Sequence, residues 1–158
     1  MSITDANFGI FPERDNLIID KLVEVQQKYG YPYRINIAWA KNQKSQVVAI
    51  AKKLMGTVFN NGLTLSVQSL TDKVLENIKR KNLEINKLEE VFNLCAVNSV
   101  PVNTELILGL PGEDIDTWKE NFYRLYDINQ HNGIEVFQAQ LLENAEMNLS
   151  QRSAYGLE

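Results

Sequence analysis

The chain has 158 residues, of which 44% are hydrophobic and 23% charged, and this composition is typical of one globular domain. Its formal net charge of −4 argues against a broad basic surface for nucleic acid, and the lack of a long apolar stretch or signal peptide predicts a cytoplasmic protein without a membrane segment. The only cysteine, Cys95, excludes an internal disulfide and a metal cluster bound by several thiolates of this chain.

Apolar runs of strand length alternate with segments of helical period along the chain. The first half predicts, in order, a strand at residues 3–8, a helix capped by Asp15 or Asn16 and ended by Gly30, a strand at 33–40, a helix from Ser45, and a turn at Asn60, Asn61 and Gly62. The second half predicts a strand at 63–68, a helix capped by Thr71, a helix opened by a capping box of Asn86 and Glu89, a strand at 102–108, a helix from Asp114, and a strand at 134–141. This alternation is typical of βαβ units, so the sequence predicts an α/β fold with parallel strands.

The predicted strands differ from those of an ordinary parallel sheet, which is apolar on both faces. With the side-chain period of two, one face collects the polar residues Asp5, Asn7, Asn36, Ser66, Gln68, Asn103 and Glu105. Buried polar groups without partners cost about 1–3 kcal/mol each, so water or a ligand must satisfy so many of them. A barrel with a polar interior supplies that setting. The alternative is that some of these residues lie at strand ends and bond to loops.

Two segments contain recognisable motifs. The first is Leu65-Ser66-Val67-Gln68-Ser69-Leu70, and the second is Thr104-Glu105-Leu106-Ile107-Leu108-Gly109-Leu110-Pro111-Gly112-Glu113. Together with Asp5-Ala6-Asn7-Phe8 near the start, they resemble the radical S-adenosylmethionine superfamily, in the branch whose members often carry a cobalamin-binding domain. The resemblance covers nearly the whole chain.

The resemblance implies a partial TIM-like parallel β/α barrel of about five strands, equivalent to strands two to six of the family's six-stranded barrel. We expect residues 1–143 to form this barrel and residues 144–158 to form an irregular tail that ends in Leu157-Glu158, which resembles a cloning scar. The family binds a 4Fe–4S cluster through a C-x-x-x-C-x-x-C motif after its first strand. That motif is absent from this sequence. We therefore expect a piece of a larger enzyme that does not bind the cluster itself.

The same resemblance implies a set of residues for S-adenosylmethionine, namely Ser66, Gln68, Arg80, Asn103, Glu105, Gly109 and Gly112. Gln68 and Arg80 have the spacing of a ligand-binding pair in relatives that resemble coproporphyrinogen dehydrogenase. A guanidinium at Arg80 suits the ligand carboxylate, and Glu105 suits a ribose hydroxyl or the amino group. Alternatively, Arg80 is solvated at a helix end, and the two glycines serve only a tight turn. Glu113 and Asp114 are predicted to cap a helix, and His131 to lie in a turn.

Three functions remain open from the sequence. The first is part of a radical S-adenosylmethionine enzyme that functionalises or methylates a C–H bond of a small-molecule substrate, with cobalamin in the larger protein. The second is a non-catalytic module that binds S-adenosylmethionine. The third is an aldolase-type barrel with Lys41 as a Schiff-base lysine. The unpaired edge of residues 3–8, with Phe8 and Ile10 exposed, predicts a homodimer or larger oligomer.

Overall fold

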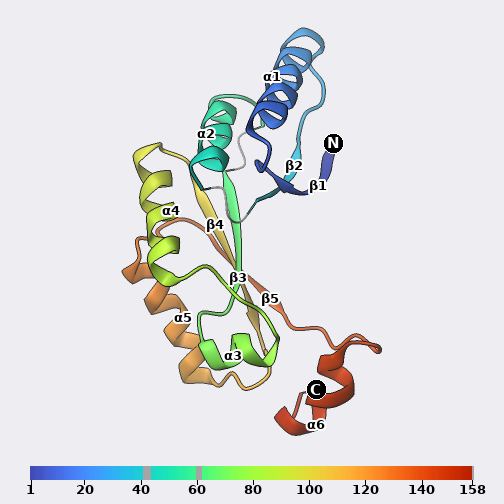
Figure 1. Ribbon diagram of the computed structural model, residues 1–158, viewed down its shortest axis with the longest axis vertical. Helices are drawn as coiled ribbons and strands as arrows, with labels where there is room; N and C mark the ends of the chain where they lie inside the picture. The colour runs from blue at the N-terminus through green and yellow to red at the C-terminus, as the bar shows by residue number, and fades with distance from the viewer. Residues whose placement is uncertain (41–43, 60–61, 158) are drawn as a thin grey trace. The chain divides into compact units, whose positions relative to one another are not determined.

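The computed structural model describes residues 1–40, 44–59 and 62–157 of the chain (Figure 1). Lys41 and the turn residues Asn60 and Asn61 lie outside this range. The fold is α/β, as predicted. Its elements in chain order are β1 Ser2–Phe8, α1 Pro12–Tyr29, β2 Asn36–Trp39, α2 Lys44–Leu54, β3 Leu63–Gln68, α3 Asp72–Asn77, α4 Ile85–Val97, β4 Val102–Leu108, α5 Ile115–Asp127, β5 Ile134–Gln138, a π-helical turn Met147–Gln151 and α6 Arg152–Tyr155.

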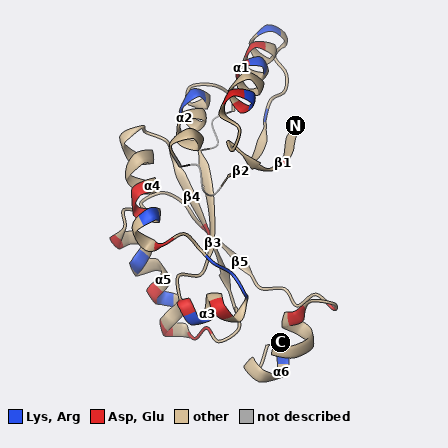
Figure 2. Cartoon of the chain, viewed as in Figure 1, with Lys and Arg blue, Asp and Glu red and all other residues tan. Residues whose placement is uncertain are grey.

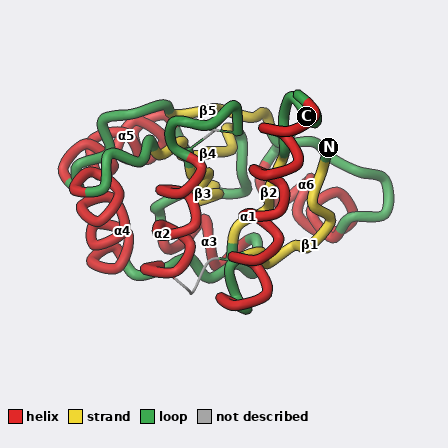
Figure 3. Tube along the Cα trace, turned by 90° about the horizontal axis from the view of Figure 1, so that it is seen from above, coloured by secondary structure: helices red, strands yellow, loops and turns green. Residues whose placement is uncertain are grey.

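The five strands of the described residues form two sheets, one with the order β1-β2 and one with the order β3-β4-β5 (Figure 3). β1 pairs with β2 in parallel, and β4 pairs with β5 in parallel. β2 is shorter than predicted because its first residue, Asn36, already pairs with Ser2 at the start of β1. β5 ends early because its last bond to β4 runs from the Ala139 amide to the carbonyl of Leu108, where β4 ends.

The chain divides into two compact units. The first unit comprises residues 1–65 and 89–103, and the second comprises residues 66–88 and 104–158. A hydrophobic cluster of the first unit contains Phe8, Ile19, Ile35, Ile50, Leu54 and Phe59. The prediction of an exposed Phe8 is therefore wrong, because only 1% of this residue is exposed and its ring meets Trp39 edge to face at 6.1 Å. Ile10 is 41% exposed, as predicted.

The start of α1 differs from the prediction of a cap at Asp15 or Asn16. The helix begins at Pro12, which favours the first helical position because its fixed φ suits the helix and it has no N–H to satisfy. Asp15 lies inside the first turn, fully buried, and its carboxylate accepts bonds from the amides of Gly9 at 2.7 Å and Phe11 at 3.2 Å. Asp15 thus satisfies amides that precede the helix, although it is not the capping residue.

Other helix ends give mixed results. Thr71 precedes α3 but makes no capping bond with its side chain. The capping box predicted at Asn86 and Glu89 is wrong, because α4 already begins at Ile85 and its first bonds are accepted by the carbonyl of Glu84. Asp114 caps α5 as predicted, in a capping box with Thr117.

The residues after 143, predicted to be irregular, include two short helical segments. The side-chain Nε2 of Gln151 donates to the carbonyl of Asn77 at 2.6 Å, and the Tyr155 hydroxyl donates to Asn77 Oδ1 at 3.1 Å. These contacts attach the end of the chain to α3 within the second unit. Within the described ranges, no helix has the length and apolar character needed to cross a membrane.

Candidate functional site

The carboxyl ends of β3 and β4 bring several of the predicted site residues together in the second unit. Both strands alternate as predicted. In β4, Val102, Thr104 and Leu106 are buried, while Asn103, Glu105 and Ile107 are half-buried. Thr104 is the polar exception on the buried face, and its hydroxyl accepts a bond from the side chain of Gln130 at 2.6 Å. The other face of β4 is therefore the one that carries Glu105.

Ser66 of β3 and Glu105 of β4 are in direct contact. The Ser66 hydroxyl donates to Glu105 Oε2 at 2.5 Å, and both side chains are half-buried. This contact joins the two strands that carry the motifs. Both side chains belong to the polar face that the alternation of residues predicts. A carboxylate accepts several hydrogen bonds, so Glu105 keeps acceptor capacity beyond the bond from Ser66.

Gln68, the last residue of β3, has two unusual properties. Its backbone has φ of 64°, in the left-handed region that residues other than glycine seldom adopt. Its side-chain oxygen Oε1 is buried and has no hydrogen-bond partner among the described residues. Because a buried acceptor without a donor is costly, this oxygen is suited to a donor group on a ligand.

Arg80 follows α3 in a basic connection with Lys79 and Lys81 (Figure 2). Its Nη2 donates to the carbonyl of Ser66 at 2.8 Å, and partial burial lowers the pKa of its guanidinium below the ordinary value. The description of Arg80 as a freely solvated residue is therefore wrong. Its guanidinium lies against the end of β3, and no carboxylate of the described residues pairs with it.

The other polar residues assigned to this face belong to the first unit. Asn103 lies two residues before Glu105 on β4. The carboxylate of Asp5 accepts from the Asn7 amide at 2.9 Å and from Arg14 at 2.6 Å, and these bonds lower the pKa of Asp5. Asn7 and Asn36 are exposed. Asp5 lies in the middle of β1, and its carboxylate is satisfied by Asn7 of the same strand and Arg14 of α1.

Gly109 and Gly112 both have positive φ, at 86° and 81°. A Cβ on Gly112 would lie 2.7 Å from Asn77 Nδ2, which donates to the carbonyl of Pro111. Both the positive φ and the packing against Asn77 therefore favour glycine at position 112. At Gly109 a Cβ would meet only Ala139, at 3.9 Å, so the requirement there is conformational.

Glu113 does not cap α5, contrary to the prediction. Its Oε1 accepts bonds from Ser69 at 3.2 Å and from Asn121 at 3.1 Å. Asn121 is 1% exposed and also accepts from the Leu70 amide at 2.6 Å. This network joins the segments that follow β3 and β4, and no motif in the sequence predicts it. A signal was present, since Asn121 is one helical turn before Leu125 on the buried face of α5.

Burial raises the pKa of Glu113, while its bonds from Asn121 and Ser69 oppose that rise. A raised pKa in the folded state means that stability from this group is present at low pH and is lost as the pH rises through the folded-state pKa. We therefore expect Glu113→Gln to gain stability relative to the unmodified chain as the pH rises from about 4 to 7. Urea unfolding at several pH values measures this difference. The exposed Glu120→Gln on α5 is the matched control, and a difference that falls with pH would contradict the assignment.

Metal-binding groups are scarce in this chain. Cys95 is 1% exposed, and burial raises the pKa of its thiol to about 11, so it is a neutral core residue at ordinary pH. His131 is exposed in the connection before β5. The described part of the chain contains no group of three or more histidine, cysteine or acidic residues arranged to hold a metal ion. The residues present do not fit an iron–sulfur cluster.

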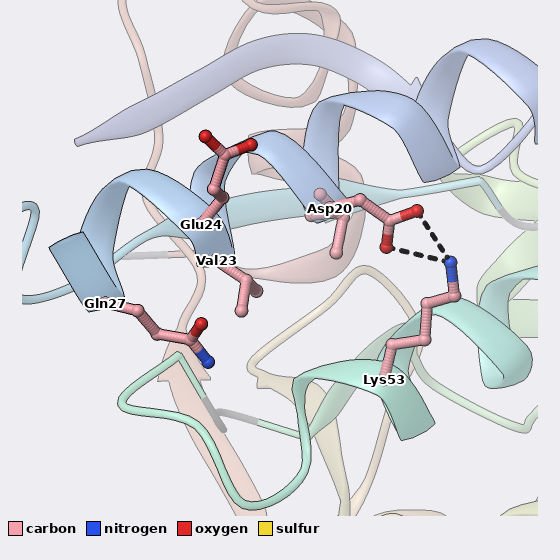
Figure 4. A pocket seen from close by; sticks show the side chains of 6 residues that line it. Asp20, Val23, Glu24, Gln27 and Lys53 are labelled. Atoms are coloured by element: carbon pink, nitrogen blue, oxygen red, sulfur yellow. Dashed lines mark hydrogen bonds and ion pairs between the residues drawn. The ribbon is translucent and has the colours of Figure 1, made fainter.

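A surface pocket lies between α1 and α2 in the first unit (Figure 4). Its volume is about 320 Å³, and its lining includes Asp20 and Lys53, which pair with each other at 2.9 Å. Because this ion pair already satisfies its main charged groups, the pocket is a weaker candidate than the ends of β3 and β4.

Comparisons with known proteins agree with the fold and the motifs. The chain is 35% identical over 156 residues to the cobalamin-dependent radical SAM methyltransferase TokK of Streptomyces tokunonensis, and equally to 2-(S-pantetheinyl)-carbapenam-3-carboxylate methyltransferase of Streptantibioticus cattleyicolor. Each alignment covers 98% of this chain. The chain belongs to the radical S-adenosylmethionine superfamily.

The solved structure of coproporphyrinogen III oxidase from Escherichia coli, a radical SAM enzyme, has a similar fold. Its TM-score to this chain is 0.62 at 16% identity, with 89% of this chain and 32% of that chain covered. This likeness confirms the partial TIM-like barrel. The chain spans 23% of the length of the two methyltransferases. No family model matches the sequence.

Proposed function

We propose that this chain forms the S-adenosylmethionine-binding part of a cobalamin-dependent radical methyltransferase, and that methylation of a small-molecule substrate belongs to the larger enzyme. The observation that carries the proposal is the buried, unpartnered Oε1 of Gln68 at the end of β3. Two residues before Gln68 on β3, the Ser66 hydroxyl donates to Glu105 of β4, and Arg80 donates to the carbonyl of Ser66. The names of the methyltransferase relatives supply the reaction class.

The chemistry of this donor and acceptor set suits S-adenosylmethionine. The ligand has an ammonium group and ribose hydroxyls, which donate, and these match the acceptors at Gln68 and Glu105. It also has a carboxylate, which matches the guanidinium of Arg80. The site therefore offers acceptors for the ammonium group and hydroxyls of the ligand and a cationic donor for its carboxylate.

The cluster of the family has no ligands in this chain, because Cys95 is buried and neutral. Binding of S-adenosylmethionine by this chain alone thus depends on hydrogen bonds and one guanidinium. We expect its affinity to be weak. The same observation is compatible with the second function considered above, a module that binds the nucleotide without catalysis.

Calorimetric titration of the chain with S-adenosylmethionine tests the proposal. We expect saturable binding that Glu105→Gln and Gln68→Ala each weaken about tenfold or more, because hydrogen bonds to charged groups contribute about 1.5–3 kcal/mol. Glu76→Gln, on the exposed surface of α3, is the matched control and should leave the affinity unchanged. Absence of binding, or binding that neither site variant weakens, would refute the assignment.

We also propose that a second chain covers the outer edge of β1. Among the strands that the structure describes, β1 pairs with β2 alone, and Ile10 just beyond it is 41% exposed. An open strand edge is a template for pairing with another chain. Light scattering should detect a dimer or larger assembly, and a monomer at high concentration would contradict this proposal.

A further inference from the structure

Gln68 needs outside support to keep its conformation. Its φ of 64° brings the Cβ close to the backbone, and only glycine adopts this region freely. Such conformations persist where neighbouring groups hold them, and they are common at binding sites.

Asn82 contacts the backbone on both sides of Gln68. Its Nδ2 donates to the carbonyl of Val67 at 2.7 Å and to the carbonyl of Ser69 at 2.7 Å. One side-chain amide therefore bridges the Val67–Gln68 and Ser69–Leu70 peptide units, one before and one after the Cα of Gln68. This bridge fixes the direction of the chain as it leaves β3.

Asn82 also contacts Arg80. The Arg80 Nε donates to Asn82 Oδ1 at 3.3 Å, while Arg80 Nη2 donates to the carbonyl of Ser66 at 2.8 Å. The amide of Asn82 thus uses its donors on the backbone around Gln68 and its acceptor on the guanidinium. It links the backbone around Gln68 to the side chain of Arg80, the two residues that are proposed to hold oppositely charged groups of one ligand.

We propose that Asn82 is a positioning residue, which holds Gln68 in its left-handed conformation and orients Arg80 for the ligand. Only the identity of the ligand in this proposal rests on the proposed function. The conformational part concerns the chain without ligand and is tested separately.

The first experiment is NMR of the ligand-free chain, in which the Cα and Cβ chemical shifts of Gln68 report its backbone conformation. Asn82→Ala should move these shifts away from left-handed values. Lys81→Ala, an exposed neighbour, is the control and should leave them unchanged. Unchanged Gln68 shifts in a folded Asn82→Ala variant would overturn the proposal.

The second experiment is a double-mutant cycle measured by urea unfolding. Gln68→Gly removes the need for support, because glycine adopts a positive φ without a clash. Gln68→Gly should therefore raise the folding equilibrium constant at least about twofold more when it is added to the unmodified chain, where Asn82 holds Gln68 at positive φ, than when it is added to the Asn82→Ala variant, where Gln68 has left that conformation. If Asn82→Ala alone does not fold, the double variant should regain the fold. Additive effects, or a double variant that stays unfolded, would overturn the proposal.

Calorimetry with S-adenosylmethionine completes the test. Asn82→Ala should weaken binding about tenfold, an effect that a merely structural role would not produce in a folded variant. If the unmodified chain does not bind this ligand, the proposed function fails, and the NMR and unfolding results still decide whether Asn82 positions Gln68. If the chain binds but Asn82→Ala retains full affinity, the positioning role is refuted.

Discussion

Replacing Phe8 with alanine is expected to lower the free energy of unfolding by about 3–5 kcal/mol. Phe8 ends β1, is 1% exposed and packs in the cluster that contains Ile19 of α1 and Ile50 of α2. The smaller side chain loses the transfer energy of the ring and leaves a cavity that a packed core closes only in part. Urea unfolding monitored by circular dichroism measures the change.

Phe11→Ala is the matched control, because Phe11 is close in sequence but 58% exposed. Its ring contacts the guanidinium of Arg14 at 4.7 Å, and such exposed contacts contribute about 0.5–1 kcal/mol. We expect a loss in that range. Equal losses for the two variants would mean that Phe8 is not part of the core in solution.

Replacing Asn121 with alanine is expected to cost about 2–4 kcal/mol of unfolding free energy, since it leaves more than one polar group without its partner. The Leu70 amide loses its acceptor, and Glu113 loses the donor at 3.1 Å. Urea unfolding is again the measurement, with the exposed Asn144→Ala as the control.

Asn121→Asp separates the two bonds of this residue. An aspartate still accepts from the Leu70 amide, but its carboxylate lies beside that of Glu113. We therefore expect Asn121→Asp to be more destabilising at neutral pH than at pH 4, where carboxyl groups become protonated. A cost of Asn121→Ala below about 1 kcal/mol would show that water replaces the network without penalty.

The order of strands and helices could be predicted from the sequence because the apolar residues repeat at clear strand and helix periods. The contact of Ser66 with Glu105 also followed from alternation, since the period of two places both residues on one face of adjacent strands. Helix starts were less predictable. At α1 the fixed φ of Pro12 determined the start, and Asp15 then bonded to preceding amides instead of capping.

The parts that could not be predicted depend on contacts between residues distant in sequence. Glu113 resembles a cap because it precedes a helix, and only the folded chain brings it to Ser69, 44 positions earlier. Asn82 belongs to no motif, and its role depends on the position of the β3 carbonyls. Phe8 was predicted to be exposed because a strand without a neighbour was expected to leave its end uncovered, whereas its side chain turns into the core.

The burial of the only thiol gives this chain a built-in reporter of unfolding. Cys95 lies within α4, is 1% exposed and has a pKa of about 11, so a thiol reagent meets neither an accessible nor an ionised sulfur in the folded state. Its modification rate therefore measures how often the structure around α4 opens. A protein with several exposed thiols would require those cysteines to be removed before such an experiment, whereas this sequence is already suited to it.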